Sequence, residues 1–137
     1  MAKRKGLGAE DHLQHSVINY LLYQYNVIAI PNNTESNKTW GEQRKFKYNG
    51  GRKGVLDLFV PIIEGGYGGL FLELKAENKN PYKLNGELRK NETLQAQEDS
   101  IKRLLSYGYY ATFAVGFDQT KEIIDKYVKG EIMPENY

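Results

Sequence analysis

The spacing of apolar and polar residues predicts three helices. From Gly8 to about Asn26, apolar side chains recur at steps of three and four residues, with acids in the first turn, which predicts an amphipathic helix. A second helix is predicted over roughly 92–107, ended by Gly108. A third has an apolar stripe over residues 123–128, and we expect Asp118 to cap it.

Short runs of β-branched and aromatic residues predict four strands, over residues 27–30, 55–60, 69–75 and 109–115. Gly65–Gly69 is expected to connect the second and third strands as a hairpin, and Asn49-Gly50 is interpreted as another hairpin turn. The predicted order is α-β-β-β-α-β-α. It favours an α/β fold with a mixed sheet flanked by helices.

The size of the chain predicts one domain. With 137 residues and 15.7 kDa, of which 40% are apolar, there is enough apolar surface for one core, placed at about residues 9–128 between tails 1–8 and 129–137. The longest nearly apolar stretch, residues 55–63, is too short to cross a bilayer, and no N-terminal signal pattern is visible, so neither export nor membrane insertion is expected.

The absence of cysteine from the sequence narrows the chemistry. It excludes disulfides, cysteine nucleophiles, iron–sulfur clusters and zinc sites built on thiolates. It also fits a reducing compartment, and we expect a bacterial or phage-infected host cytoplasm. No P-loop sequence is present, so no nucleotide cofactor is expected.

Positive charge is concentrated in one stretch although the formal net charge is only +2. The stretch from Lys38 to Lys53 contains only one acid, Glu42, and six basic residues: Lys38, Arg44, Lys45, Lys47, Arg52 and Lys53. Trp40, Phe46 and Tyr48 lie between them, a mixture that can neutralise phosphates and stack on unpaired bases. The stretch is therefore interpreted as DNA-binding, with a solvated loop as the alternative.

Ionisable residues interrupt two apolar strands. Asp57 lies in the second strand and Glu73 in the third, where the two-residue period places Glu73 and Lys75 on one face. If the strands pair as a hairpin, Asp57 and Glu73 lie side by side, which is unfavourable unless a cation with oxygen preference bridges them. The pattern predicts a magnesium site, with manganese as a substitute; the alternative is an ordinary ion pair at a sheet edge.

Three further polar residues bear on this site. Gln97 shares the sheet-facing side of its helix with Ile101, where an amide needs a partner. Glu10 lies on the apolar side of the first helix and is interpreted equally as a metal-linked residue or as an acid that complements the helix dipole. His12 and His15 have the spacing of a zinc pair, but no cysteine or third histidine completes it, so a solvated helix face is preferred.

The ordered set of these residues resembles the PD-(D/E)xK nuclease superfamily, and in particular its VRR-NUC domain. The likeness runs from Glu10 to Val128 and includes Pro31-Asn32, Gly51–Leu58, Leu72–Lys75, and Gln97 with Gly108-Tyr109. Leu56 stands where the superfamily name has proline. The resemblance implies a restriction-endonuclease-like core.

The same resemblance implies a role for each site residue. Asp57 and Glu73 would bind the metal with the Leu74 carbonyl, and Glu10 would help through water. Lys75 would act on the nucleophile, and Gln97 would orient Lys75 or the water.

The small stand-alone length resembles phage-type members of the family that resolve Holliday junctions as homodimers. We therefore predict a magnesium-dependent, structure-selective DNA endonuclease acting in recombination and repair on branched DNA. The alternatives are a flap or nicking nuclease and a non-catalytic DNA-binding module with a nuclease fold. A homodimer interface is predicted on the first helix, at Tyr20, Leu22, Tyr23 and Tyr25, with core packing as the alternative.

Overall fold

The computed structural model describes residues 6–32 and 39–132, in which the elements follow the order α-β-α-β-β-α-β-α. In chain order they are α1 (Ala9–Tyr25), β1 (Ile30–Pro31), α2 (Trp40–Tyr48), β2 (Leu58–Val60), β3 (Leu70–Lys75), α3 (Glu92–Ser106), β4 (Tyr110–Val115) and α4 (Gly116–Val128). The predicted α/β class is confirmed, with α2 as an additional helix. No described helix is long and apolar enough to span a membrane.

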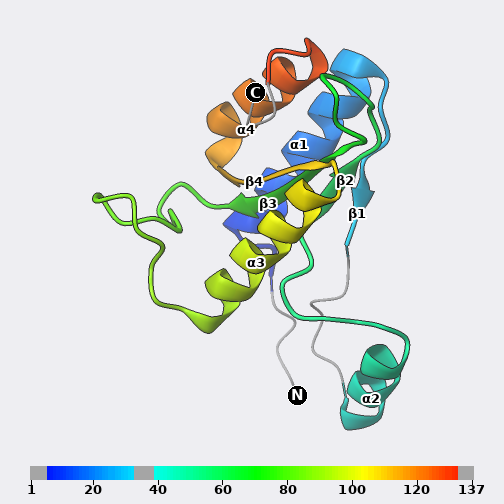
Figure 1. Cartoon of the computed structure of the whole chain (residues 1–137), viewed down its shortest axis with the longest axis vertical. Helices are drawn as coiled ribbons and strands as arrows, with labels where there is room; N and C mark the ends of the chain where they lie inside the picture. The colour runs from blue at the N-terminus through cyan, green and yellow to red at the C-terminus, as the bar shows by residue number, and fades with distance from the viewer. Residues whose placement is uncertain (1–5, 33–38, 133–137) are drawn as a thin grey trace.

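A four-stranded mixed sheet in the order β1-β2-β3-β4 forms the centre of the molecule (Figure 1). The pairs β1–β2 and β2–β3 are antiparallel and β3–β4 is parallel. The larger core packs α1 and α4 on one face, and a smaller core packs α3 on the other. Since both faces are covered, β3 is buried on both sides.

Side chains of β3 alternate between these two cores, as the two-residue period predicts. Leu70, Leu72 and Leu74 belong to the core under α1 and α4, and Phe71 packs against the core under α3. Glu73 and Lys75 follow Phe71 at two-residue steps, so they share the α3 face.

The interpretation of Asn49-Gly50 as a hairpin turn is wrong. Residues 40–48 form α2, which begins after Thr39, whose hydroxyl accepts a hydrogen bond from the Glu42 N–H. Gly50 has φ +89° and follows the helix end, with its N–H bonded to the Lys47 carbonyl. Glycine is favoured both in a hairpin turn and after a helix end because both need a positive φ, and here the cap at Thr39 favours the helix.

Two predicted strands are shorter than expected. The run at 27–30 contributes only Ile30 to β1, which extends to Pro31, a residue tolerated there because β1 is at the sheet edge. The run at 55–60 is a strand only from Leu58. Before it, the Leu74 N–H donates to the Asp57 carboxylate, which takes the place of a ladder hydrogen bond.

The predicted end of α3 is confirmed, and the predicted cap of α4 is wrong. Gly108 ends α3 as predicted, with φ +93° and an N–H that bonds to the Leu105 carbonyl. Asp118 does not cap α4, because this helix already begins at Gly116. The Gln119 side chain instead accepts a hydrogen bond from the Val115 N–H.

Two tyrosines of the predicted dimer interface contact α4 of the same chain. The hydroxyls of Tyr20 and Tyr25 both donate to one carboxylate oxygen of Asp125. The alternative of packing within the chain therefore holds for these two, while Leu22 and Tyr23 are exposed. Burial acts to raise the pKa of Asp125, but hydrogen bonds from both tyrosines and Lys121 outweigh it and lower this pKa below its ordinary value.

Asp125→Ala is expected to lower the free energy of unfolding by about 2 kcal/mol at pH 7, because two partly buried hydroxyls lose their acceptor. A carboxylate with a lowered pKa stabilises the fold above its unfolded pKa, near 4, and this stabilisation is lost as pH falls through the folded pKa. Urea unfolding at pH 7 and pH 3 should therefore show a smaller difference between variant and wild type at pH 3. Asp118→Ala, at an exposed acid of the same helix, is the control, and an equal effect of both substitutions would contradict the prediction.

Candidate active site

Asp57 lies at the start of β2 and is held against β3. Its Oδ2 accepts a hydrogen bond of 2.8 Å from the Leu74 N–H. The antiparallel register of β2 with β3 begins at Leu58, which pairs with Leu72, and Asp57 directly precedes it. The hydrogen bond from Leu74 therefore holds the Asp57 carboxylate beside the backbone of the residue that follows Glu73.

Glu73 and Lys75 form an ion pair inside the fold. Lys75 Nζ lies 3.9 Å from Glu73 Oε2, and the two side chains are only 12% and 4% exposed. The ammonium also lies 5.8 Å from the centre of the Phe113 ring. An ion pair at a sheet edge was the alternative prediction; the pair exists, but β3 is an interior strand between β2 and β4. Ionic groups taken this far out of water need a compensating role or partner.

Gln97 adds a polar group to the same side of the sheet. It lies on α3 and is 2% exposed, one turn before Ile101 of the smaller core. Its side-chain oxygen is buried and accepts no hydrogen bond from the described residues. A buried amide oxygen of this kind is costly, and it leaves an acceptor available to a group that enters from solvent.

The Leu74 carbonyl is directed to the Asp57 side of β3. The N–H and C=O groups of one strand residue point the same way, and the Leu74 N–H bonds to Asp57. The candidate donors are therefore two carboxylates and one carbonyl, all hard oxygen ligands. This set fits magnesium, which binds through one or two carboxylates and retains several waters.

Glu10 is exposed in the first turn of α1. That turn lies near the end of β3, because Ala9 and His12 line a pocket of about 470 Å³ together with Ala76 and Glu77. Among residues 6–32 and 39–132, no three His, Cys, Asp or Glu side chains form a group that could hold a metal. Glu10 therefore does not complete a three-carboxylate cluster with Asp57 and Glu73, and its metal role stays a prediction.

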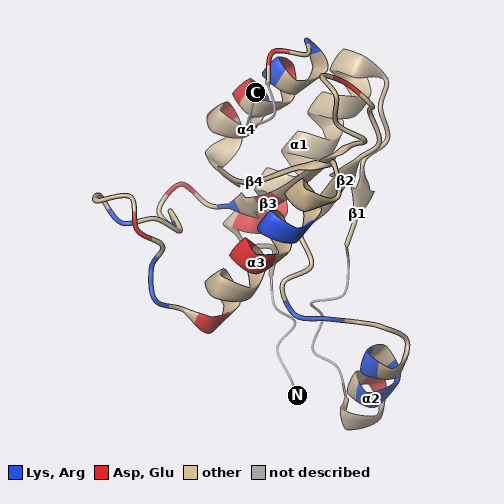
Figure 2. Ribbon diagram, in the orientation of Figure 1, with Lys and Arg blue, Asp and Glu red and all other residues tan. Residues whose placement is uncertain are grey.

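The predicted basic residues lie on α2 and on the segment that follows it. Arg44, Lys45 and Lys47 are exposed on the helix, and Arg52 and Lys53 are exposed on the way to β2. Lys38 lies outside the described residues. Figure 2 shows α2 standing apart from the sheet with its basic residues grouped on it. This segment is thus a projecting basic helix rather than a loop.

The aromatic residues of this segment differ in their surroundings. Trp40 and Tyr48 are exposed, and the Arg44 guanidinium lies 5.0 Å from the centre of the Trp40 ring. Phe46 is partly buried and its ring lies against Gly51. A Cβ on Gly51 would come within 2.4 Å of this ring. Trp40 and Tyr48 are therefore the exposed rings of this segment.

Gly54 positions the segment before Asp57, a role that the sequence patterns did not reveal. It is buried, has φ +82°, and a Cβ there would lie 2.6 Å from the Ala96 backbone. Only glycine allows this close approach to α3 together with the left-handed conformation. The sequence shows that Gly54 lies between two basic residues and an apolar run, but it does not show that Gly54 packs against α3.

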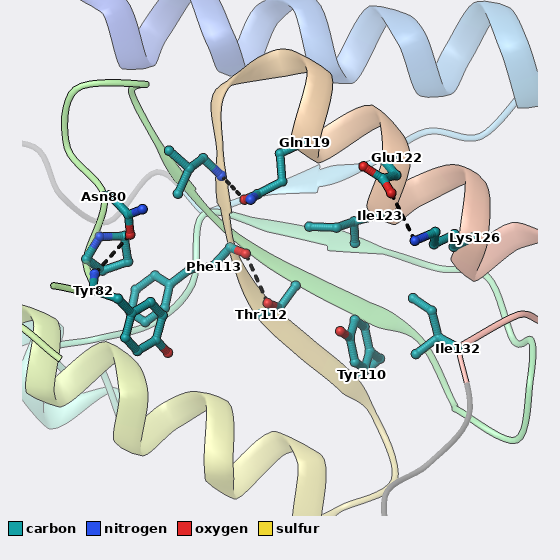
Figure 3. A pocket seen from close by; sticks show the side chains of 12 residues that line it. Asn80, Tyr82, Tyr110, Thr112, Phe113, Gln119, Glu122, Ile123, Lys126 and Ile132 are labelled. Carbon is teal, nitrogen blue, oxygen red and sulfur yellow. Dashed lines mark hydrogen bonds and ion pairs between the residues drawn. The ribbon is translucent and has the colours of Figure 1, made fainter. Parts of the chain in front are cut away.

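A pocket of about 600 Å³ has Phe113, the ring beside the Lys75 ammonium, in its lining (Figure 3). Residues of β4, α4 and the loop before α3 line it, Thr112, Gln119 and Tyr82 among them, and none of the candidate catalytic residues does. His15, the second residue of the discarded zinc pair, is exposed and contacts the Asn19 amide. Neither feature belongs to the candidate site.

The fold and the polar residues of the candidate site together define a class of protein. It is a mixed α/β domain with an acidic pair and a lysine at its central strands. The chain is similar to a solved structure described as "VRR_NUC domain protein", with 28% sequence identity, 92% of each chain covered and a TM-score of 0.65. No protein-family model and no curated protein matches the chain. The chain thus has a VRR-NUC nuclease fold, as predicted, and this match suggests a nuclease.

Proposed function

We propose that the protein is a magnesium-dependent, structure-selective DNA endonuclease of the PD-(D/E)xK superfamily. One observation carries the proposal: Glu73 and Lys75 form a buried ion pair on β3, the Asp57 carboxylate accepts a hydrogen bond from the Leu74 N–H between them, and α3 buries Gln97. The donor set fits magnesium, and manganese is the expected substitute. The fold match to a VRR-NUC domain protein supports the nuclease class.

The residues divide the work of phosphodiester hydrolysis. Asp57 and Glu73, with the Leu74 carbonyl, would hold the cation, which supplies Lewis-acid stabilisation of the scissile phosphate. Glu73 also keeps the Lys75 ammonium in place, 3.9 Å away. Lys75 stabilises the negative charge that develops on the phosphate as water attacks phosphorus and one P–O bond breaks. The free Gln97 oxygen accepts a hydrogen bond from the attacking water or from Lys75.

Cleavage of defined DNA structures tests this function. We expect the protein to cut a labelled four-way junction in magnesium or manganese and to be inactive in EDTA. Preference for a flap, or single nicks in linear duplex, would establish the flap or nicking alternative. Binding without cleavage of any structure in either metal would establish a non-catalytic DNA-binding module and overturn the proposal.

A four-way junction also requires two opposed cuts, so we propose a homodimer of the phage-type resolvase kind. The exposed residues Leu22 and Tyr23 remain the candidate contact, without Tyr20 and Tyr25. Sedimentation at micromolar concentration should give about twice 15.7 kDa. Mixing wild type with Asp57→Asn should yield heterodimers that nick one junction strand, whereas paired cuts by a strict monomer would overturn the dimer.

A further inference from the structure

The loop between β3 and α3 contains a small ordered hairpin, residues 81–89, which we call the finger. The Lys83 N–H bonds to the Glu87 carbonyl at 2.8 Å, and the Arg89 N–H bonds to the Pro81 carbonyl at 2.9 Å. Tyr82 and Leu88 form an antiparallel bridge between the two arms. Figure 1 shows this loop projecting from the sheet beyond the end of β3.

The base of the finger is fixed to the α3 side of the fold. Pro81 is buried, and the Tyr82 ring packs edge-on against Phe113 with centroids 5.8 Å apart. The same Phe113 ring lies 5.8 Å from the Lys75 ammonium. The finger is therefore attached to the ring that also supports the candidate catalytic lysine.

The tip of the finger is shaped by its own sequence. Gly86 has φ +85° and its N–H bonds to the Lys83 carbonyl, while the Asn85 side chain accepts a hydrogen bond from the Glu87 N–H. This turn leaves the whole Leu84 side chain in water, the most exposed large apolar residue of the described chain. A leucine held fully exposed on an ordered tip has no role in the core.

The charge around the finger is positive. Residues 76–90 carry two acids, Glu77 and Glu87, and four bases, Lys79, Lys83, Arg89 and Lys90. Figure 2 shows this loop and α2 on opposite sides of α3. DNA bound across the candidate site could thus contact a basic element on each side. A projecting loop with an excess of bases favours nucleic acid over a protein or a lipid surface as its partner.

We propose that the finger is a wedge for branched DNA: its bases bind backbone phosphates, and Leu84 inserts between bases at the branch and unstacks them. The inference rests on the nuclease function proposed above and deepens it by assigning the element that selects the substrate. Apolar side chains inserted between base steps are a known means of unstacking DNA. The three residue steps from the buried Pro81 to Leu84 span at most about 10 Å, so Leu84 can reach over a length of roughly three base steps from the base of the finger.

The experiment compares Leu84→Ala with Ile63→Ala, each combined with Asp57→Asn to prevent cleavage. Ile63 is a matched control because it is an aliphatic loop residue, 80% exposed, beyond the other end of β2 from Asp57. Fluorescence anisotropy gives the affinity for a four-way junction and for linear duplex. A 2-aminopurine base at the branch reports unstacking through increased fluorescence.

We expect Leu84→Ala to reduce the junction-over-duplex preference about tenfold and to remove the 2-aminopurine signal, while Ile63→Ala changes neither. Leu84→Phe, which keeps a large apolar side chain, should show the same preference and the same 2-aminopurine signal as leucine at this position. Leu84→Ala could instead keep the junction-over-duplex preference and the 2-aminopurine signal, while the protein without Asp57→Asn still cuts junctions. That result would overturn the wedge proposal and leave the proposed nuclease function intact. If the wild-type chain neither binds nor cuts DNA, both proposals fail.

Discussion

Asp57→Asn, Glu73→Gln and Lys75→Ala should each lower the rate of DNA cleavage about a thousandfold and leave DNA binding close to wild type. The first two changes remove carboxylates that would bind the proposed cation. The third removes a positive charge that would stabilise the developing phosphate charge, an interaction with a few kcal/mol of effect on the barrier. Single-turnover cleavage of a labelled junction, with anisotropy for binding, measures both quantities.

The fold should survive these substitutions. Asparagine at position 57 keeps an oxygen that can accept the 2.8 Å hydrogen bond from the Leu74 N–H. We also expect Asp57→Asn to raise the metal-free Tm, because it relieves repulsion between the carboxylates of Asp57 and Glu73. Circular dichroism melting in EDTA measures this change.

Two exposed residues of α3 provide matched controls, Asp99→Asn and Lys102→Ala. They remove the same kinds of charge from the helix that carries Gln97 and should keep the wild-type rate. The catalytic assignment would be abandoned if any of the three site variants, folded and DNA-bound, cleaved at a near-wild-type rate.

The sequence predicted the core of the fold because its strongest periodicities lie in segments that pack against other elements. The residues Leu13, Val17 and Leu21 are spaced for one helix face, and all three are buried. The failures lie where local preference is ambiguous. Asn49-Gly50 is compatible with a hairpin and with a helix end, and the deciding cap at Thr39 stands ten residues earlier.

The candidate site could be predicted in part for a related reason. Acids inside apolar strands are conspicuous, and a two-residue period fixes the face of Glu73 and Lys75 without knowledge of the partner strands. The hydrogen bond from Leu74 to Asp57 depends on register, and the contact of Gly54 with α3 depends on tertiary packing. Neither can be derived from spacing along one chain.

Alanine at five basic residues should weaken binding to every DNA structure by about 10²–10³-fold in moderate salt. The set is Arg44, Lys45, Lys47, Arg52 and Lys53, all exposed on or after α2. Each lost phosphate contact should also flatten the dependence of log K on log salt by just under one unit. Since junction and duplex present the same phosphate backbone to these exposed bases, selectivity between the two should change little.

The geometry of α2 makes this effect separable from a loss of stability. No residue of this helix is buried, so its charges can be removed without disturbing either core. Lys45→Ala with Lys47→Ala is therefore matched by Lys126→Ala with Lys129→Ala, two exposed lysines at the end of α4, on the other face of the sheet from α3. Titrations at several salt concentrations should show a flatter slope for the α2 pair only. An unchanged slope in the fivefold variant would mean that this helix is a solvated element that does not contact DNA.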